Sequence, residues 1–312
     1  MKRRTFAYLL ILATVALFLS PCSKMDMRMG VGNGSGVRLS YRAVGKGPAL
    51  VVIHGGPGYE KALMYPGFDA LSSDLKVVYY DQRGCGSSEP LGVSTPMDIP
   101  HHVEDLEALR QYLRLPEISI AAHGWGALIA LGYCLEYGRN VNSLILITPI
   151  SPFMPDQTVE STVDNLPRKT RDEIWEIYNH PQLSMLEKRE RAMKLLLPTL
   201  FYREEGMDRV DLNSLSISAD FNARAMAELG SLDIFPEMED IEVPTLVVVG
   251  RHDPSTSVRD QMAYADGIRT SSAIVFNGSG HFPFLEEPRL FTEVSKEFLL
   301  HGSLPALVRL EQ

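Results

Sequence analysis

Asp253 and His281 are the side chains of this 312-residue chain whose types and positions best suit acid–base chemistry. Each follows a strand-like apolar run, one ending at Val249 and the other at Phe276. A histidine oriented by a carboxylate can take the proton of a hydroxyl nucleophile, so the pair suits acyl transfer through a covalent intermediate. That chemistry also requires a nucleophile and backbone donors for the developing oxyanion.

The segment Ala122-His123-Gly124-Trp125-Gly126 lies where a nucleophile would be expected. It joins a buried strand-like run, Ile118 to Ala122, to an apolar helical run, Ala127 to Tyr137, which is the context of a nucleophile elbow. Position 124 carries glycine instead of serine, so it has no side chain that could attack a carbonyl. Glycine tolerates the positive φ of such an elbow, so we expect the turn to fold and the covalent step to be lost or severely impaired.

Two further motifs follow strand-like runs. His54-Gly55-Gly56-Pro57-Gly58 comes after the run Ala49 to Ile53. Its glycines allow backbone N–H groups to approach a substrate carbonyl, as an oxyanion-hole loop requires. Asp81-Gln82-Arg83-Gly84-Cys85-Gly86-Ser87-Ser88 comes after the run Lys76 to Tyr80.

On these motifs the chain resembles the α/β-hydrolases of the prolyl iminopeptidase type, with HGGPG at His54 and DQRGCGSS at Asp81 as the most specific marks. The likeness extends from Gly36 to Leu300. It implies an α/β-hydrolase fold, with a mostly parallel central sheet flanked by helices and an inserted α-helical cap. It also implies an aminopeptidase that acts on small peptides or amides through Ser-Asp-His acyl transfer.

The resemblance assigns roles to five positions. It implies that the backbone N–H groups of Gly56 and Trp125 are the oxyanion donors, that Asp253 is the orienting acid and that His281 is the general base. The order of elbow, acid and base along the chain also matches this family. Gly124 is the departure, at the nucleophile position.

Several interpretations of Gly124 remain open at this stage. It can be an engineered substitution that traps a substrate complex, or a natural loss of turnover. For the function of the protein, the alternatives are a general esterase, lactone or amide hydrolase, and a non-catalytic ligand-binding pseudoenzyme. A further alternative is direct activation of water by His281, without a covalent intermediate.

An enzyme of the resembled type must hold a free α-amino group, which requires carboxylates that project from the cap. Glu204, Glu205 and Glu228 are candidates by their location, although acids on cap helices are commonly exposed. Trp175, Phe201 and Tyr202 could line an apolar pocket or form the core of the cap.

The N-terminus has the pattern of an export signal. Lys2-Arg3-Arg4 precedes an uninterrupted apolar run from Phe6 to Leu19, which is short for a membrane span. Leu19 lies three positions before Cys22, as in a lipoprotein signal, whereas Pro21 departs from that pattern. We therefore expect a periplasmic or secreted protein and leave open a lipid anchor at Cys22.

The order of strand-like and helix-like segments predicts how the chain is divided. Strands and helices alternate as far as Pro149, which indicates a parallel sheet with crossover helices, and helical segments alone occupy the following stretch. The predicted units are an export signal over 1–22, a linker over 23–36, the first part of the hydrolase core over 37–150, a helical cap over 151–236 and the second part of the core over 237–312.

Composition narrows the possible partners. The formal net charge is −9, and removal of residues 1–21, with three basic and no acidic residues, leaves 27 basic against 39 acidic residues, or −12. A nucleic-acid partner is therefore not expected, and the partner should be a small molecule or short peptide. CxxC, HExxH and clustered His/Cys spacings are absent from the sequence, so we expect neither metal nor cofactor.

Four other residues that can do chemistry are expected to have structural roles. Cys85 and Cys134 are expected to be reduced thiols rather than a substitute nucleophile or a disulfide. The adjacent pair His101-His102 is expected at the surface of a helix.

Overall fold

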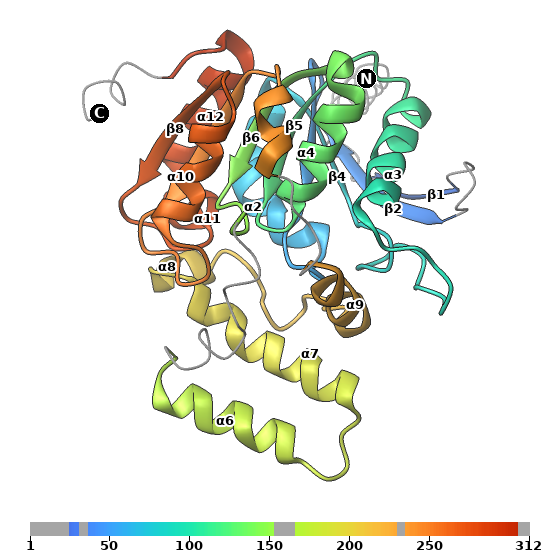
Figure 1. Ribbon diagram of the computed structural model, residues 1–312, viewed down its shortest axis with the longest axis vertical. Coiled ribbons are helices and arrows are strands. Elements are labelled where there is room, and N and C mark those ends of the chain that lie inside the picture. Colours follow the sequence, from blue (N-terminus) through green and yellow to red (C-terminus); the bar gives the residue numbers. More distant parts are fainter. Residues whose placement is uncertain (1–24, 31–36, 153–165, 230–234, 305–312) are drawn as a thin grey trace, which may run out of the picture.

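A computed structural model describes residues 25–30, 37–152, 166–229 and 235–304 (Figure 1). The predicted export signal and Cys22 lie outside these residues and stay a prediction. No helix in the described part of the chain is both long enough and apolar enough to cross a membrane.

Eight strands form the central sheet in the order β1-β2-β4-β3-β5-β6-β7-β8. They are β1 (Met25–Gly30), β2 (Arg38–Val44), β3 (Ala49–Ile53), β4 (Lys76–Tyr80), β5 (Ile118–His123), β6 (Val141–Ile147), β7 (Thr245–Gly250) and β8 (Ser271–Phe276). The β1–β2 and β2–β4 pairs are antiparallel, and all other neighbours are parallel. Every residue of β3, β5 and β7 is buried, which explains their continuous apolar runs, because helices cover both faces of a parallel sheet.

Two hydrophobic clusters pack on opposite faces of the sheet. One includes residues of α3 (Ile99–Tyr112), α4 (Gly126–Tyr137) and α10 (Val258–Gly267). The other includes residues of α2 (Tyr65–Phe68), α11 (Pro283–Glu286) and α12 (Pro288–His301). The part of the chain outside the cap also contains short 3-10 helices: η1 (Lys61–Met64), η2 (Asp69–Ser73), η3 (Gly138–Asn140) and η5 (Phe235–Asp240). The fold is the predicted α/β-hydrolase fold.

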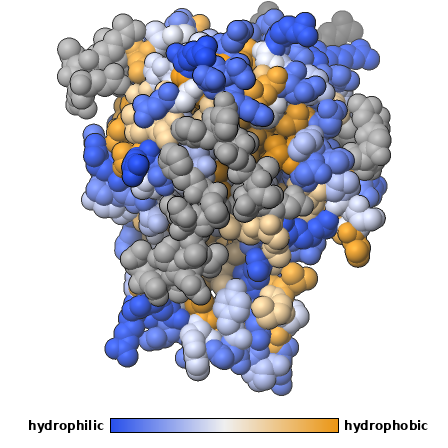
Figure 2. Space-filling model, in the orientation of Figure 1, coloured by the Kyte–Doolittle hydropathy of each residue, from blue (hydrophilic) through white to orange (hydrophobic). Residues whose placement is uncertain are grey.

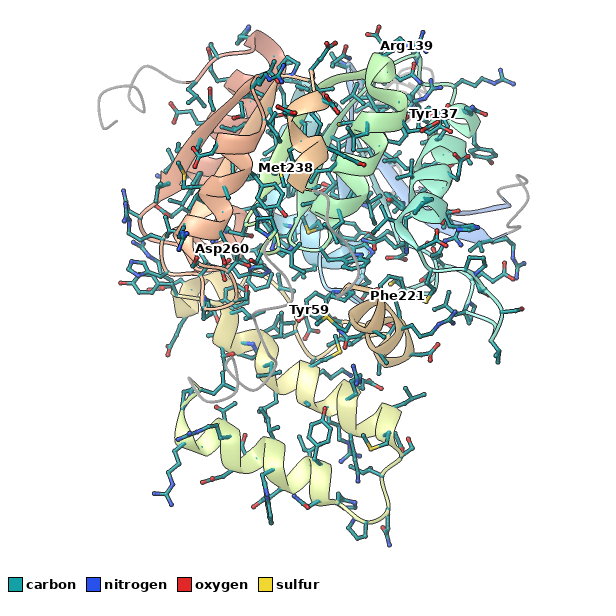
Figure 3. The ribbon with its side chains drawn as sticks, viewed as in Figure 1. Tyr59, Tyr137, Arg139, Phe221, Met238 and Asp260 are labelled. Atoms are coloured by element: carbon teal, nitrogen blue, oxygen red, sulfur yellow. The ribbon has the colours of Figure 1, made fainter. Side chains whose placement is uncertain are left out.

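A helical cap separates β6 from β7 and extends away from one edge of the sheet (Figure 1). It contains α6 (Arg168–Asn179), α7 (Met185–Leu196), η4 (Leu197–Leu200), α8 (Glu204–Met207) and α9 (Ala219–Leu229). Tyr59, just after the HGGPG loop, and Phe221 of α9 both lie where the core faces the cap (Figure 3). On the face of the molecule seen in Figure 2, hydrophobic residues lie in separate patches among hydrophilic ones.

The strand register brings the predicted motifs to that edge. Ile53, the last residue of β3, pairs with both Tyr80 of β4 and Ala122 of β5. Gly250 at the end of β7 likewise pairs with Phe276 at the end of β8. Because ligands of open parallel sheets bind beyond the carboxyl ends of the strands, the motifs that follow these strands form a common site.

The fold differs from the sequence-based expectations in two places. Residues 25–30, expected within a linker, form β1 and pair with β2. His102 was wrongly expected at the surface: it is 1 % exposed because the face of α3 that carries it packs against Phe221 of the cap.

Candidate active site

Gly124 lies in a tight turn between β5 and α4. Its φ is +52°, and its N–H donates to the Ile147 carbonyl at 3.0 Å, which ties the turn to the neighbouring strand. A Cβ atom built on Gly124 would lie 3.3 Å from His281 Nε2. A serine hydroxyl at this position would therefore start within reach of the imidazole, as a nucleophile elbow requires.

The side chains of His281 and Asp253 contact each other directly. His281 Nδ1 lies 2.8 Å from Asp253 Oδ2, and the two side chains are 9 % and 0 % exposed. A carboxylate only accepts hydrogen bonds, so Nδ1 carries the proton and Nε2 is the nitrogen free for chemistry. Nε2 is also the atom nearest to the built Cβ of Gly124, so the ring is aimed at the nucleophile position.

Ser255 is a third member of this cluster that the sequence reading missed. Its hydroxyl lies 2.7 Å from Asp253 Oδ1 and 3.0 Å from His281 Nδ1, and its backbone N–H donates to the same Oδ1 at 2.8 Å. A serine two residues after an aspartate is typical of a local turn in which side chains form hydrogen bonds with the backbone. The sequence therefore contained a signal for the contact between Ser255 and Asp253.

Two side chains at the ends of neighbouring strands hold the main chain of His281. Its carbonyl accepts hydrogen bonds at 2.9 Å from both His123 Nε2 and Thr148 Oγ1. Burial, and then the neighbouring His281, hold the pKa of His123 well below its usual range, so His123 is neutral and donates through Nε2–H. His123, the residue before Gly124, thus holds the main chain of the predicted base, a contact that the sequence did not reveal.

The Gln82 side chain and backbone connect the three motifs around the predicted oxyanion donors. Its side chain donates to the His54 carbonyl at 2.7 Å and accepts from Trp125 Nε1 at 3.1 Å. Its backbone N–H donates to His54 Nε2 at 3.1 Å. These bonds hold the HGGPG loop against the start of α4, where the two predicted oxyanion donors lie.

The backbone N–H groups of Gly56 and Trp125 are the predicted oxyanion donors. Within the described residues neither one donates a hydrogen bond. Gly56 has a φ of +132°, a conformation that favours glycine, and Trp125 is the N-cap residue of α4. Free backbone donors, of which Trp125 lies at a helix N-terminus, favour negative charge, so their chemistry suits an oxyanion.

The DQRGCGSS segment has a structural role. Asp81 is fully buried and accepts from Lys61 Nζ at 2.7 Å and from the Ser87 N–H at 2.9 Å. Arg83 is fully buried as well and forms a two-pronged ion pair with Asp105, both contacts at 2.8 Å. These pairs fix the loop that carries Gln82.

One cap segment, Leu200 to Arg203, lies against the His281 loop. The His281 N–H donates to the Leu200 carbonyl at 2.9 Å. Phe201 packs on Phe282 with ring centroids 4.5 Å apart, and Tyr202 stacks on His252 at 3.7 Å. The cap therefore contacts both the loop that carries His281 and the loop that carries Asp253.

No described contact brings the cap carboxylates proposed from the sequence to the Gly124–His281–Asp253 cluster. Glu204 and Glu205 lie in α8 and are both exposed. Glu228 lies in α9, but its side chain is outside the described residues. The role of these three residues therefore stays a prediction.

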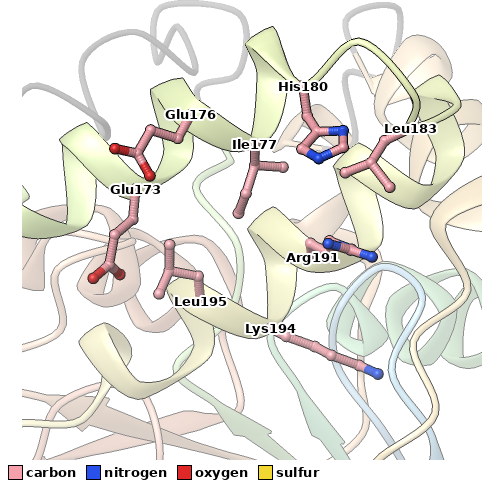
Figure 4. A pocket seen from close by; sticks show the side chains of 8 residues that line it. All are labelled: Glu173, Glu176, Ile177, His180, Leu183, Arg191, Lys194 and Leu195. Atoms are coloured by element: carbon pink, nitrogen blue, oxygen red, sulfur yellow. The ribbon is translucent and has the colours of Figure 1, made fainter.

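A separate groove of about 560 Å³ lies between α6 and α7 of the cap (Figure 4). Its lining combines acidic, basic and aliphatic side chains: Glu173, Glu176, Ile177, His180, Leu183, Arg191, Lys194 and Leu195. None of these belongs to the Gly124–His281–Asp253 cluster, so the groove is not part of the reaction centre.

Comparison with known proteins agrees with this geometry. The family described as alpha/beta hydrolase fold matches residues 48–288. The chain belongs to this family. A proline iminopeptidase of Heyndrickxia coagulans is 28% identical over 287 residues, which cover 85% of this chain and 96% of the relative. The prolyl iminopeptidase-like resemblance is thereby confirmed.

Solved structures of other α/β-hydrolases share the fold. An esterase from Exiguobacterium antarcticum has a TM-score of 0.71 and 23% sequence identity, with 88% of this chain and 99% of the esterase covered. A proline iminopeptidase from Mycobacterium smegmatis has a TM-score of 0.66 and 20% identity, with 88% and 97% covered. At these identities the likeness supports the architecture rather than a substrate.

Neither cysteine of the described hydrolase can replace serine at position 124. Cys85 and Cys134 are both free and buried. Burial raises the pKa of Cys85 well above its usual range, so its thiol stays protonated and unreactive. No group of three or more potential metal-ligating side chains occurs among the described residues.

Proposed function

We propose that this hydrolase has the reaction centre of a proline iminopeptidase-like aminopeptidase for small peptides or amides, and that Gly124 blocks its covalent step. The observation that carries the proposal is the 3.3 Å distance between His281 Nε2 and a Cβ atom built on Gly124. The base is placed for a serine that the chain does not have.

In a variant with serine at 124, His281 would take the hydroxyl proton as the oxygen attacks a carbonyl. Asp253 would stabilise the resulting imidazolium, and the Gly56 and Trp125 N–H groups would bind the oxyanion. In another Ser-His-Asp enzyme, loss of the serine lowers kcat by about 10⁶, which is about 8 kcal/mol in barrier. The oxyanion site alone can retain a rate about 10³ to 10⁴ above that in water.

Reaction with a fluorophosphonate probe tests the proposal. We expect Gly124→Ser to become labelled at residue 124 and the unaltered chain to remain unlabelled. Gly138→Ser is a matched control, because a Cβ built on Gly138 meets only Val243 Cγ2 within 4 Å, at 3.9 Å. Absence of labelling in a folded Gly124→Ser variant, or labelling of the unaltered chain, would contradict the proposal.

A general acyl hydrolase is the second candidate. It is favoured by the exposure of Glu204 and Glu205, because an aminopeptidase needs a carboxylate that faces the substrate amine. A reaction centre without that carboxylate would accept esters and blocked amides as readily as free amines. The two candidates share the same covalent chemistry and differ in the substrates of the Gly124→Ser variant.

A further inference from the structure

We propose that Asn222 of the cap is a positioning residue for the HGGPG loop, whose Gly56 N–H is a predicted oxyanion donor. The inference deepens the proposed function and rests on it, because the direction of this N–H matters only if the loop meets an oxyanion. Asn222 lies in the first turn of α9, about a hundred positions after the elbow at Gly124. It acts through the main chain of the loop rather than on the substrate.

The first half of the HGGPG loop is held by the core. The His54 carbonyl accepts from the Gln82 side chain at 2.7 Å, and His54 Nε2 accepts from the Gln82 N–H at 3.1 Å. His54 follows β3 and Gln82 lies just beyond β4. These bonds therefore fix the start of the loop relative to the central sheet.

The carbonyl groups of the second half are bonded to the cap. The Gly58 carbonyl accepts from the Ser218 N–H at 2.8 Å, and Asn222 Nδ2 donates to the Pro57 carbonyl at 2.9 Å. A Cβ atom on Gly58 would lie 2.6 Å from the Ser218 carbonyl oxygen and 3.3 Å from Asn222 Cβ, so a side chain at position 58 would clash with the cap. The loop and the start of α9 are therefore in direct contact.

Gly56 lies between the half held by the core and the half bonded to the cap. Its φ of +132° lies in a region that glycine adopts without strain. The ring of Pro57 fixes its own φ, whereas both dihedral angles of Gly56 rotate easily, so a displacement of Pro57 is taken up largely at Gly56. The direction of the Gly56 N–H therefore depends on the cap as well as on the core.

Arg189 of α7 orients the Asn222 amide. Arg189 Nη1 donates to Asn222 Oδ1 at 3.1 Å. A guanidinium group only donates and a carbonyl group only accepts, so one orientation of the amide satisfies both of its neighbours. In that orientation Nδ2 faces the Pro57 carbonyl. A chain of hydrogen bonds thus runs from α7 through Asn222 to the oxyanion loop.

Other bonds fasten α9 to the core without reaching this loop. The Arg224 guanidinium donates to the Gly92 carbonyl at 3.1 Å and also to the Thr95 carbonyl. These contacts do not involve Asn222. Loss of the Asn222 donor should therefore leave the cap attached, and its effect should appear at the loop.

The kinetics of Asn222→Asp in the Gly124→Ser background test the proposal. Aspartate keeps the size of asparagine and its contact with Arg189, but its carboxylate cannot donate to the Pro57 carbonyl. With p-nitrophenyl acetate we expect kcat to fall about 10-fold or more, because misplaced oxyanion donors slow the chemical step. KM should change little, since the lost interaction acts in the transition state. The Tm should stay close to that of the parent.

Three further variants separate positioning from other effects. Asn222→Ala should show the same split between kcat and KM, which excludes an effect of the added charge. Asn179→Asp is the matched control, because Asn179 Nδ2 donates to the Trp175 carbonyl within α6 at 2.7 Å. Arg224→Ala should lower the Tm and keep the parent kcat. An unchanged kcat in Asn222→Ala, or an equal loss of kcat in Arg224→Ala, would overturn the proposal.

The NMR signal of the Gly56 amide in the unaltered chain gives a readout that needs no serine. We expect it to shift in Asn222→Ala and to stay unchanged in Asn179→Asp and Arg224→Ala. An unchanged Gly56 signal in Asn222→Ala would overturn the proposal. If the signal shifts while Gly124→Ser does not react with fluorophosphonate, the proposed function fails and the positioning of the loop by Asn222 stands.

Discussion

The Glu286 carboxylate accepts a hydrogen bond from the Tyr202 N–H at 2.7 Å and thereby ties the catalytic core to the cap. The same oxygen accepts from the Arg203 N–H at 2.9 Å. The other oxygen accepts from the N–H groups of Gly280 and Phe282, at 2.9 and 3.2 Å. These two residues flank His281, so one buried side chain fixes both the cap segment and the loop of the base.

Glu286→Gln should therefore destabilise the protein and displace His281. An amide has one accepting oxygen, so two of the four N–H groups lose their partner. Loss of hydrogen bonds to a charged group costs about 2–4 kcal/mol in unfolding free energy here. The measurements are denaturant unfolding and the NMR signals of the His281 imidazole.

Glu287→Gln is the matched control. Glu287 is only partly buried and accepts from the Gly278 N–H at 2.8 Å and the Ser279 hydroxyl at 2.7 Å, both of which belong to the core. It should leave the His281 signals nearly unchanged. Equal effects of the two substitutions would show that Glu286 does not position the base.

Ser255→Ala should impair catalysis in the Gly124→Ser background without unfolding the protein. The Ser255 hydroxyl bonds Asp253 and His281, and loss of a hydrogen bond to a charged group costs about 1.5–3 kcal/mol. We expect kcat to fall about 10- to 100-fold and KM to change little, because Ser255 acts through the imidazole.

Ser257→Ala provides the comparison for Ser255→Ala. Ser257 caps α10 by accepting from the Asp260 N–H at 3.1 Å, so its loss should cost about 1 kcal/mol of stability and leave kcat unchanged. If Ser255→Ala behaved in the same way, its role would be structural only. The His281 Nδ1–H chemical shift gives a readout that needs no activity.

The sequence was sufficient for the parts of the site that depend on local patterns. Continuous apolar runs marked the parallel strands, and the motifs after them placed Gly124, Asp253 and His281 in the right order. Contacts between segments that are far apart in the sequence could not be predicted from such local patterns. His123 and Thr148 hold the His281 carbonyl, and nothing in their neighbourhood along the chain indicates that partner.

Burial of individual polar residues was equally hard to predict. His102 is buried because the face of α3 that carries it meets Phe221, a residue of the cap more than a hundred positions later. A helical pattern gives the spacing of a face but not the partner that covers it.

The two thiols of the core should resist modification in the folded protein. Cys85 and Cys134 are 1 % and 5 % exposed, and burial raises the pKa of Cys134 to about 12. At pH 8 the thiolate fraction of Cys134 is then about 10⁻⁴, and it increases only as the pH approaches the raised pKa. A Cys22→Ser variant should react with a thiol reagent only after denaturation. Rapid reaction of the native variant would show that a thiol is accessible.

Substrate preference decides between an aminopeptidase and a general acyl hydrolase. In the Gly124→Ser variant we expect a higher kcat/KM for prolyl anilide than for acetyl-prolyl anilide. A carboxylate in the cap that pairs with the substrate ammonium would lose its partner when the amine is blocked, which leaves a desolvated charge unpaired. The loss amounts to a few kcal/mol, or about 100-fold in kcat/KM.

Single substitutions of Glu204, Glu205 and Glu228 by Gln then identify the carboxylate. The one that faces the substrate should remove the preference for the free amine and leave activity on a short-chain ester unchanged, because the ester has no ammonium group. The exposed positions of Glu204 and Glu205 make Glu228 of α9 the more informative substitution. Equal rates on free and blocked anilides in the parent variant, or activity on esters alone, would exclude the aminopeptidase and leave the general acyl hydrolase.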